Sequence, residues 1–370
     1  EDQAARRTQP PKDMSAMDGY AARAADIASV PATLSCIGEA PAGRSFPGTV
    51  GPGECVRIFT GGAVPEGADT IVIQEDTGRD GDKVLVRESS KPGTWVRPAG
   101  LDFAEGEVLL EAGRVLTARD IGLAAAMNLP WLPVRRKPRV ALLATGDEIV
   151  NPGEPLGPDD IVSSNSHGLS ALVQACGGEP VNLGIARDDA DSLRRLAAGA
   201  RGADILVTSG GASVGDHDLI RSVLGDADLE VDFWRIAMRP GKPLIFGHFG
   251  DVPLLGLPGN PVSAMVCSLL FLRPALRRMR GLPDAGAPTL RARLAAGLRA
   301  NDRRQDYLRA RLATGADGAR EVTAFEKQDS SMMRLLQRSD CLIVRPPHAP
   351  ALDAGNWVEV LQFCSEDGGI

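Results

Sequence analysis

The stretch ADILVTSGGASVGDHD, residues 203–218, decides the fold of this chain. Its apolar half has the length of a buried strand, and the paired Gly210 and Gly211 follow where that strand would end. A continuous apolar run that passes into a glycine-rich turn is typical of a parallel sheet covered on both faces. The turn leaves three interpretations open: a phosphate cradle, a metal site with Asp216 and Asp218, or only a tight connection to a helix.

The same alternation of strand and helix extends to both sides of that stretch. We expect further strands at 139–145, 180–186, 231–238, 243–249 and 252–257, and helices at 164–176, 189–200, 216–224 and 261–280. Apolar strands separated by helices predict an α/β multidomain protein whose central domain is a doubly wound, mostly parallel sheet. Its predicted bounds are residues 138–283.

The segments that flank this domain are rich in short strands and turns. Apolar runs punctuated by Gly and Pro predict an all-β module over residues 22–107 and a small β domain over residues 284–370. Before the α/β domain, Thr117 is expected to cap a helix over residues 118–128. Residues 129–138 read as a linker.

Composition and charge exclude several classes of protein. The 370 residues are 43% hydrophobic and 24% charged, an ordinary globular mixture. A formal net charge of -7 gives no global attraction to nucleic acid or to an anionic membrane. No apolar run reaches the roughly 18 residues of a membrane span. The six cysteines lack CxxC spacing, which argues against a zinc or disulfide framework and favours a cytoplasmic location.

Five polar loops are expected to meet at one edge of the predicted sheet. In an open parallel sheet, ligands bind beyond the carboxyl ends of the strands. The side chains that follow these ends are Thr145, Asp147 and Glu148; Asp188 and Asp189; Ser209 to Gly211 with Asp218; Arg239 and Lys242; and Pro258, Gly259 and Asn260. The sequence therefore predicts a cleft at this edge.

The predicted cleft combines carboxylates with cations. Glu148, Asp188 and Asp218 offer the hard oxygen ligands that Mg²⁺ prefers. Arg239 and Lys242 are suited to phosphate or another oxyanion. Together they indicate a nucleotide or phosphorylated ligand that is bound with Mg²⁺.

Each feature alone also has a plainer explanation. Asp188 and its neighbour Asp189 suit a helix cap, and Gly210 with Gly211 suits a tight turn. The glycine loop has no following Gly-Lys-Ser/Thr, so it is not a Walker A motif, and it differs from GxGxxG. The helix that begins after Asn260, with Pro at its first position, adds an N-terminus that favours anions.

Seven segments, in order along the chain, resemble the MoeA family of molybdopterin molybdenumtransferases. They are SAMDGYA (15–21), TGGAVPEGADTIVIQED (60–76), RPAGLDF (97–103), LATGDE (143–148), TSGGASVGDHD (208–218), RPGKP (239–243) and LPGNPVSA (257–264). The resemblance covers nearly the whole chain, and it extends to the related E domain of gephyrin.

The resemblance implies an activity and its reactants. Members take adenylylated molybdopterin and molybdate, hydrolyse the pyrophosphate link with help from Mg²⁺, release AMP and leave molybdenum on the dithiolene sulfurs. The adenylyltransferase that supplies the substrate and the molybdoenzymes that accept the product are implied as partners. Neither nucleic acid nor a membrane is expected.

The resemblance also implies an elongated homodimer of four-domain subunits with the cleft at the subunit interface. Residues 1–21 with 108–137 would form the linker and dimerisation domain, without its N-terminal helical part. Residues 22–107 would form the β-rich domain, 138–283 the molybdopterin-nucleotide domain, and 284–370 a C-terminal β-barrel.

Residue roles carry over by matching motifs. The catalytic set implied is Asp18, Asp102, Glu148, Asp188 and Asp218, of which the last three would hold the metal. The substrate-binding set is Thr60, Asp147, Ser209, Gly210, Gly211, Arg239, Lys242, Pro258, Gly259 and Asn260. The molybdate-binding set is Lys242, Ser263, Arg309, Ser330 and Ser331. Asp18 and Asp102 would reach the cleft of the partner subunit, and Thr60 would lie near that site.

The sequence departs from the family at two positions, and two alternative functions stand beside the one that the resemblance implies. Arg235 and Arg239 stand where members often carry Lys, and Arg offers a planar fork in place of a point charge. A molybdopterin adenylyltransferase would share the SGG loop but lacks the β modules. A gephyrin-E-like scaffold with little catalysis would not require the carboxylates at the rim.

Overall fold

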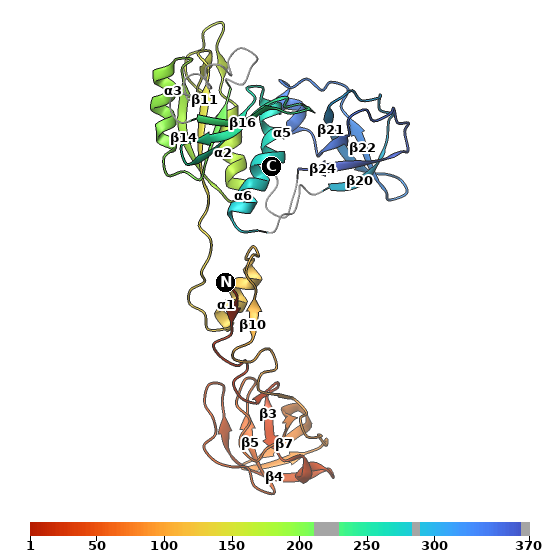
Figure 1. Ribbon diagram of the computed structural model, residues 1–370. Coiled ribbons are helices and arrows are strands. Elements are labelled where there is room, and N and C mark those ends of the chain that lie inside the picture. Colours follow the sequence, from red (N-terminus) through yellow and green to blue (C-terminus); the bar gives the residue numbers. More distant parts are fainter. Residues whose placement is uncertain (211–228, 283–288, 364–370) are drawn as a thin grey trace. The chain divides into compact units, whose positions relative to one another are not determined.

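The computed structural model describes residues 1–210, 229–282 and 289–363 (Figure 1). The chain divides into two compact units, Glu1–Val134 and Arg135–Ile370. In the described ranges, every helix is too short or too polar to span a bilayer. None of the described cysteines forms a disulfide.

A six-stranded sheet dominates the first unit, with the order β6-β3-β5-β4-β8-β7 among the described strands. Its strands are β3 (Gly19–Ala22), β4 (Ala32–Ala40), β5 (Glu54–Ile58), β6 (Thr70–Ile73), β7 (Thr77–Asp80) and β8 (Lys83–Val86). Side chains on the two sides of the sheet pack into separate clusters, one around Ile27 and Leu34 and the other around Val56 and Ile58. This sheet begins with β3, so the β-rich part starts slightly before residue 22.

The rest of the first unit joins the start of the chain to residues beyond 95. Strand β1 (Gln3–Ala4) pairs with β10 (Val108–Leu110), and β2 (Met14–Ser15) pairs with β9 (Val96–Arg97). Phe103 and Met127 lie in one buried cluster with Ala5, beside helix α1 (Ala118–Ala126). Short 3₁₀ helices occur at η1 (Ala24–Ile27) and η2 (Gln74–Asp76). The four-domain division of the chain stays a prediction.

The second unit contains the α/β sheet, with the order β14-β11-β15-β19-β18-β16. Its strands are β11 (Arg139–Thr145), β14 (Glu179–Ala186), β15 (Ile205–Ser209), β16 (Leu229–Arg235), β18 (Pro243–Phe249) and β19 (Val252–Leu257). Pairs β11–β14, β11–β15 and β15–β19 are parallel. Strand β18 is antiparallel to both of its neighbours, so the carboxyl end of β16 lies at the same edge as those of the parallel strands. The prediction of a mostly parallel sheet is confirmed.

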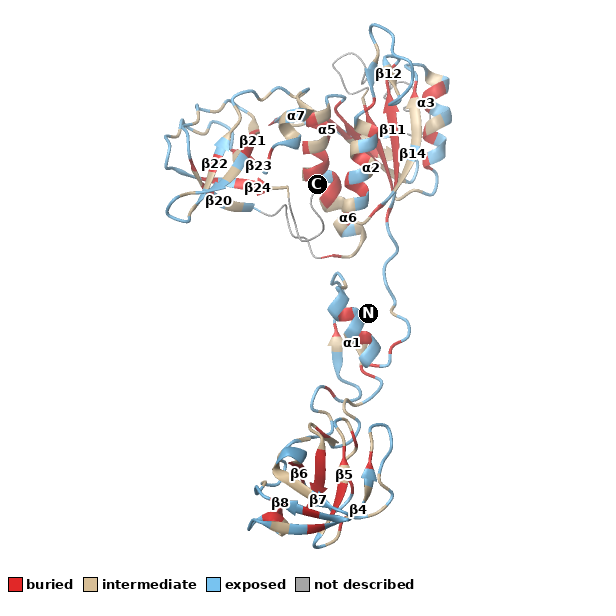
Figure 2. Cartoon of the chain, turned by 180° about the vertical axis from the view of Figure 1, so that it is seen from behind, coloured by how far each residue is buried: buried red, intermediate tan, exposed pale blue. Residues whose placement is uncertain are grey.

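Helices cover both faces of this sheet, as Figures 1 and 2 show. Helices α2 (Asn165–Ala175), α5 (Pro261–Cys267) and α6 (Arg273–Met279) bury side chains against one face. Helix α3 (Ala190–Ala197), followed by η3 (Ala198–Ala200), packs on the other face. The helix predicted at 261–280 has a π-helical interior, η4 (Ser268–Leu272), between α5 and α6. The helix predicted at 216–224 lies outside the described residues.

The C-terminal part closes into a barrel. Its strands are β20 (Thr289–Leu294), β21 (Gln305–Thr314), β22 (Arg320–Ala324), β23 (Cys341–Arg345) and β24 (Trp357–Gln362). Strand β21 pairs with both β22 and β23, which links the two ends of the order β22-β20-β24-β23. The short strand β17 (Met238–Arg239) follows β16 of the α/β sheet and pairs with β21 of the barrel. In the second unit, the sequence did not predict the short elements β12 (Ile149–Val150), β13 (Ile161–Val162) and α7 (Met333–Gln337). The sequence also did not indicate β22.

Helix α1 begins with the cap that the sequence predicted. The Thr117 hydroxyl accepts a hydrogen bond from the Asp120 amide, and the Asp120 carboxylate accepts one from the Thr117 amide at 2.7 Å. Each of these two bonds satisfies a backbone donor that the first helical turn otherwise leaves without a partner. The bond from the Thr117 amide, and a second one that the Thr117 hydroxyl donates to the same carboxylate at 2.7 Å, lower the pKa of Asp120 from its ordinary value of 3.8.

We predict that Thr117→Ala destabilises the first unit by about 1 kcal/mol, the usual cost of a lost N-cap. Urea unfolding measures it, and Thr117→Ser, which keeps the hydroxyl, serves as the control. Because the pKa of Asp120 is lower in the folded chain, its contribution is present above pH 4 or so and is lost as the pH falls through the folded pKa. An equal effect of the Ala and Ser variants would contradict this role of the hydroxyl.

Candidate functional site at the rim of the parallel sheet

A cavity of about 710 Å³ lies at the carboxyl ends of the parallel strands. The predicted site residues that line it are Glu148, Asp188, Ser209, Gly210, Lys242, Pro258, Gly259, Asn260 and Ser331. Parallel strands end at one edge, so loops that lie far apart in the sequence meet there. The polar loops predicted to converge therefore do converge.

Gly210 shapes the floor of this cavity. Its φ is +97°, and a Cβ atom at this position would lie 2.5 Å from the Thr145 carbonyl oxygen. Its amide donates to the Leu257 carbonyl at 3.4 Å, so the ends of β11, β15 and β19 approach one another at this glycine. Only glycine fits both the backbone conformation and the space.

Asn165, at the start of α2, connects two of the loops. Its Nδ2 donates to Ser209 Oγ and to the Gly259 carbonyl, each at 2.8 Å. Its Oδ1 and the hydroxyl of Thr145 are buried without a hydrogen-bond partner among the described residues, and both residues line the cavity. A buried polar atom without a partner is costly, so these atoms are suited to bind a ligand or water.

The carboxylates at this edge have different surroundings. Asp189 caps α3, since its Oδ1 accepts from the Ser192 amide at 2.7 Å. Asp147 Oδ1 accepts from the Asp188 amide at 3.2 Å and so joins the β11 loop to the β14 loop. Glu148 and Asp188 line the cavity itself. The helix-cap explanation therefore holds for Asp189, whereas Asp188 lines the cavity.

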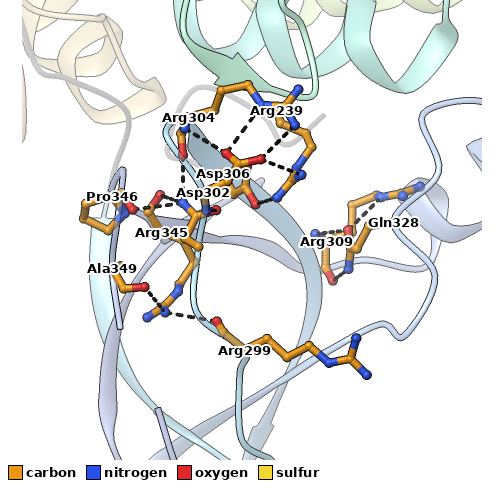
Figure 3. Close-up of polar contacts among 11 residues, drawn as sticks. Arg239, Arg299, Asp302, Arg304, Asp306, Arg309, Gln328, Arg345, Pro346 and Ala349 are labelled. Atoms are coloured by element: carbon orange, nitrogen blue, oxygen red, sulfur yellow. Dashed lines mark hydrogen bonds and ion pairs between the residues drawn. The ribbon is translucent and has the colours of Figure 1, made fainter. Parts of the chain in front are cut away.

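The cations divide between two roles. Lys242 is exposed and lines both this cavity and a second one of about 480 Å³. Arg235 also lines both, and its guanidinium carbon lies 3.6 Å from the centroid of the Trp234 ring. Arg239, expected to bind substrate, lines neither cavity. Its guanidinium contacts the carboxylates of Asp302 and Asp306 instead (Figure 3).

The residues expected around molybdate also differ in their exposure to the cavity. Ser331 lines it, and its amide and hydroxyl donate to Asp329 Oδ1 at 2.8 and 2.6 Å. Arg309 is 2% exposed and donates to the main-chain oxygens of Asp329 and Met332. Burial lowers the pKa of Arg309. Arg309 thus holds the loop that presents Ser331, rather than lining the cavity itself.

Two further serines of the molybdate-binding set, Ser263 and Ser330, are absent from the cavity lining. Ser263 is 4% exposed on α5. The Ser330 carbonyl accepts from the Val262 amide at 3.1 Å, which attaches the barrel loop to the first turn of α5. Asn260 occupies the N-cap position with Pro261 after it, but its side chain makes no capping hydrogen bond and lines the cavity.

The remaining predicted residues lie elsewhere. Asp18 Oδ1 accepts from the Thr60 amide at 2.7 Å and from its hydroxyl at 2.8 Å, and the amide bond foremost lowers the pKa of Asp18. The Asp102 amide donates to the Gln9 carbonyl. All of these belong to the first unit. Gly211 and Asp218 lie outside the described residues.

Several lining residues of the cavity were not predicted as site residues from the sequence, among them Asn165, Trp234 and Arg235. Asn165 was included only in the helix predicted at 164–176. Its place at the start of a helix that follows strand β11 was the available signal, because such positions face the rim of the sheet. Nothing in the sequence indicated that Trp234 would stack under Arg235.

These features define the class: a multidomain α/β protein with carboxylates, a lysine and serines around one cavity at the rim of its sheet. Family models match residues 1–128 as the MoeA N-terminal region (domains I and II), 141–278 as a probable molybdopterin binding domain, and 291–363 as the MoeA C-terminal region (domain IV). The chain belongs to the MoeA family of molybdopterin molybdenumtransferases.

Individual relatives are similar to this chain over most of its length. It is 37% identical to a molybdopterin molybdenumtransferase of Nostoc sp., over 95% of this chain and 83% of the relative. It is 37% identical to molybdopterin molybdenumtransferase 2 of Mycobacterium tuberculosis, over 94% of this chain and 88% of the relative. The crystal structure of a molybdopterin biosynthesis MoeA protein from Pyrococcus horikoshii matches with a TM-score of 0.84 and 32% identity, covering 98% of this chain and 92% of that one.

We predict that Gly210→Ala destabilises the second unit by roughly 1–3 kcal/mol, because alanine is strained at this φ and its Cβ would meet Thr145. Thermal or denaturant unfolding measures the change. The matched control is Gly259→Ala in the same cavity, where the nearest atom to a new Cβ is 3.6 Å away. Equal stability of the two variants would refute the close approach at Gly210.

Proposed function

We propose that the chain inserts molybdenum from molybdate into adenylylated molybdopterin, with hydrolysis of the pyrophosphate link and release of AMP, at the 710 Å³ cavity. The family establishes that the chain is a transferase of molybdenum cofactor biosynthesis. The finer proposal rests on one observation: two carboxylates, a lysine and a serine line the same cavity. These residues are Glu148, Asp188, Lys242 and Ser331.

The donor set of the cavity fits Mg²⁺, which Glu148 and Asp188 would hold. Among the described residues, no group of three or more His, Cys, Asp and Glu side chains could form an all-protein metal site. Mg²⁺ typically binds through one or two carboxylates together with phosphates and water, and Glu148 and Asp188 supply two carboxylates. Asp218 is proposed as a third. When bound, the ion would neutralise phosphate charge and lower the pKa of a water molecule.

The chain's own residues supply the remaining interactions. Ser209 and Gly210 line the cavity at the end of β15, and the N-terminus of α5 favours negative charge. Lys242 provides a positive charge for an oxyanion, and Ser331 brings a polar side chain. In the proposed reaction, water adds to one phosphorus of the pyrophosphate while its bridging P–O bond breaks, which yields AMP and a molybdopterin phosphate.

The proposed setting is a cytoplasmic homodimer. Asp18 and Asp102 would enter the partner's cleft in that assembly, with Thr60 near that site, and the short hydrogen bonds from Thr60 keep the Asp18 carboxylate ionised. An adenylyltransferase would deliver the substrate, and molybdoenzymes would accept the product. The same family membership supports each of these statements.

Molybdate-dependent AMP release tests the function. With adenylylated molybdopterin, Mg²⁺ and molybdate, the wild type should release AMP and transfer molybdenum. Asp188→Asn and Asp218→Asn should each slow this release by roughly 100-fold, because a metal contributes several kcal/mol of charge stabilisation. Asp191→Asn, at a side chain that is 95% exposed on α3, serves as the charge-matched control.

The outcomes separate the proposal from its alternatives. AMP release without molybdenum transfer, or no release by the wild type, would refute the proposed reaction. Full activity of both Asp variants would refute only the metal assignment.

Ser331→Ala tests the molybdate end of the site, because Ser331 lines the cavity whereas Ser263 is buried outside its lining. The substitution should raise the molybdate concentration needed for half-maximal transfer several-fold, the cost of about one hydrogen bond to a charged group. It should leave AMP release at saturating molybdate close to that of the wild type. A uniform loss at every molybdate concentration would contradict this assignment.

A further inference from the structure

Arg239 joins the α/β part of the second unit to the barrel part (Figure 3). Its Nη1 lies 3.3 Å from Asp302 Oδ2, and its Nη2 bonds to Asp306 Oδ2. Asp306 is 3% exposed, and its other carboxylate oxygen has no partner among the described residues. Hydrogen bonds between arginine and a carboxylate are strong, and a buried carboxylate depends on its cation.

The backbone around Arg239 makes the same connection. Strand β17 pairs in parallel with the start of β21, and the Gln305 amide donates to the Ala237 carbonyl at 2.9 Å. The Ile236 amide donates to the Lys242 carbonyl at 3.1 Å, which closes the hairpin between β16 and β18. The hairpin is therefore attached to the barrel strand that carries Asp306.

The hairpin is also packed closely against helix α5. Gly241 has a φ of +106°, and a Cβ at this position would lie 2.4 Å from Cys267 Sγ. The next residue is Lys242. The hairpin contacts the barrel on one side and α5 on the other. These contacts thus determine the backbone position of Lys242.

Lys242 and Ser331 line the same cavity but come from this hairpin and from the barrel loop. Their separation depends on how the hairpin is held against β21. We propose that Arg239 is a positioning residue: through Asp306 and Asp302 it sets Lys242 relative to Ser331, and so tunes affinity for a tetrahedral oxyanion without binding that anion. The inference rests on the proposed function in taking molybdate as the anion.

An arginine suits this position for a geometric reason. One planar guanidinium contacts two carboxylates through separate nitrogens. A lysine at this position would present one point charge. The arginine that stands here in place of the lysine expected of the family therefore suits the carboxylate pair that faces it.

The decisive variant is Asp306→Asn, which removes the buried charge but leaves Arg239 in the chain. Isothermal titration of the full chain with sodium molybdate measures the effect. Loss of positioning should weaken molybdate binding roughly tenfold, since small misplacements of binding groups have large effects. A ligand role for Arg239 predicts unchanged or tighter binding, because the guanidinium would be released. Arg239→Lys should fall between the wild type and Asp306→Asn.

Two controls separate positioning from general damage. Arg293→Met removes another barrel arginine, paired with Asp317 at 2.8 Å and Glu321 at 2.6 Å, and should leave molybdate affinity unchanged. A parallel titration with AMP should give the wild-type affinity in every variant, which a merely unfolded protein would not.

If Asp306→Asn does not fold, Asp302→Asn at the exposed carboxylate gives the same comparison. The expected loss of molybdate affinity is then smaller. Wild-type molybdate affinity in both aspartate variants would overturn the positioning role and leave the proposed function intact. Absence of molybdate binding by the wild type would overturn the proposed function, and this inference with it.

Discussion

The parallel pairing of β11, β15 and β19 is the constraint on which the site depends. It brings the carboxyl ends of these strands to one edge, and Gly210 lets them approach closely because no Cβ separates its backbone from Thr145. Asn165 then connects the Ser209 and Gly259 loops by hydrogen bonds at 2.8 Å. Carboxylates that belong to separate loops share one cavity only because the strands beneath them run in the same direction.

A second requirement is that the barrel stays attached to the sheet. The cavity draws Lys242 from a hairpin of the sheet and Ser331 from a loop of the barrel. Among the contacts that hold these parts together are β17 with β21, Arg239 with Asp306, and the Ser330 carbonyl with the Val262 amide of α5. Arg309 supports the barrel side by donating to the main chain of the same loop. The basic residues thus divide into those that face the cavity and those that hold its walls.

Much of the fold was predictable from local pattern. Apolar runs identified the strands of the parallel sheet, and the sequence at Thr117 and at Pro261 identified where helices begin. Strand β22 was missed because its sequence, Arg320–Ala324, is half polar and its pairing partner lies across a turn. The interior of the 261–280 helix is π-helical, a feature that apolar periodicity does not distinguish from an α-helix.

The sequence by itself determined the order of strands and helices, the family, and which loops follow the strands that form the rim. These properties reside in hydrophobic spacing, glycines and short motifs, which act over a few residues. Only the tertiary structure decided which charged side chains face the cavity. Arg239 and Lys242 are three residues apart, yet one pairs with a buried carboxylate of the barrel and the other lines the cavity. Their difference comes from partners more than 60 residues along the chain, and no local pattern encodes that contact.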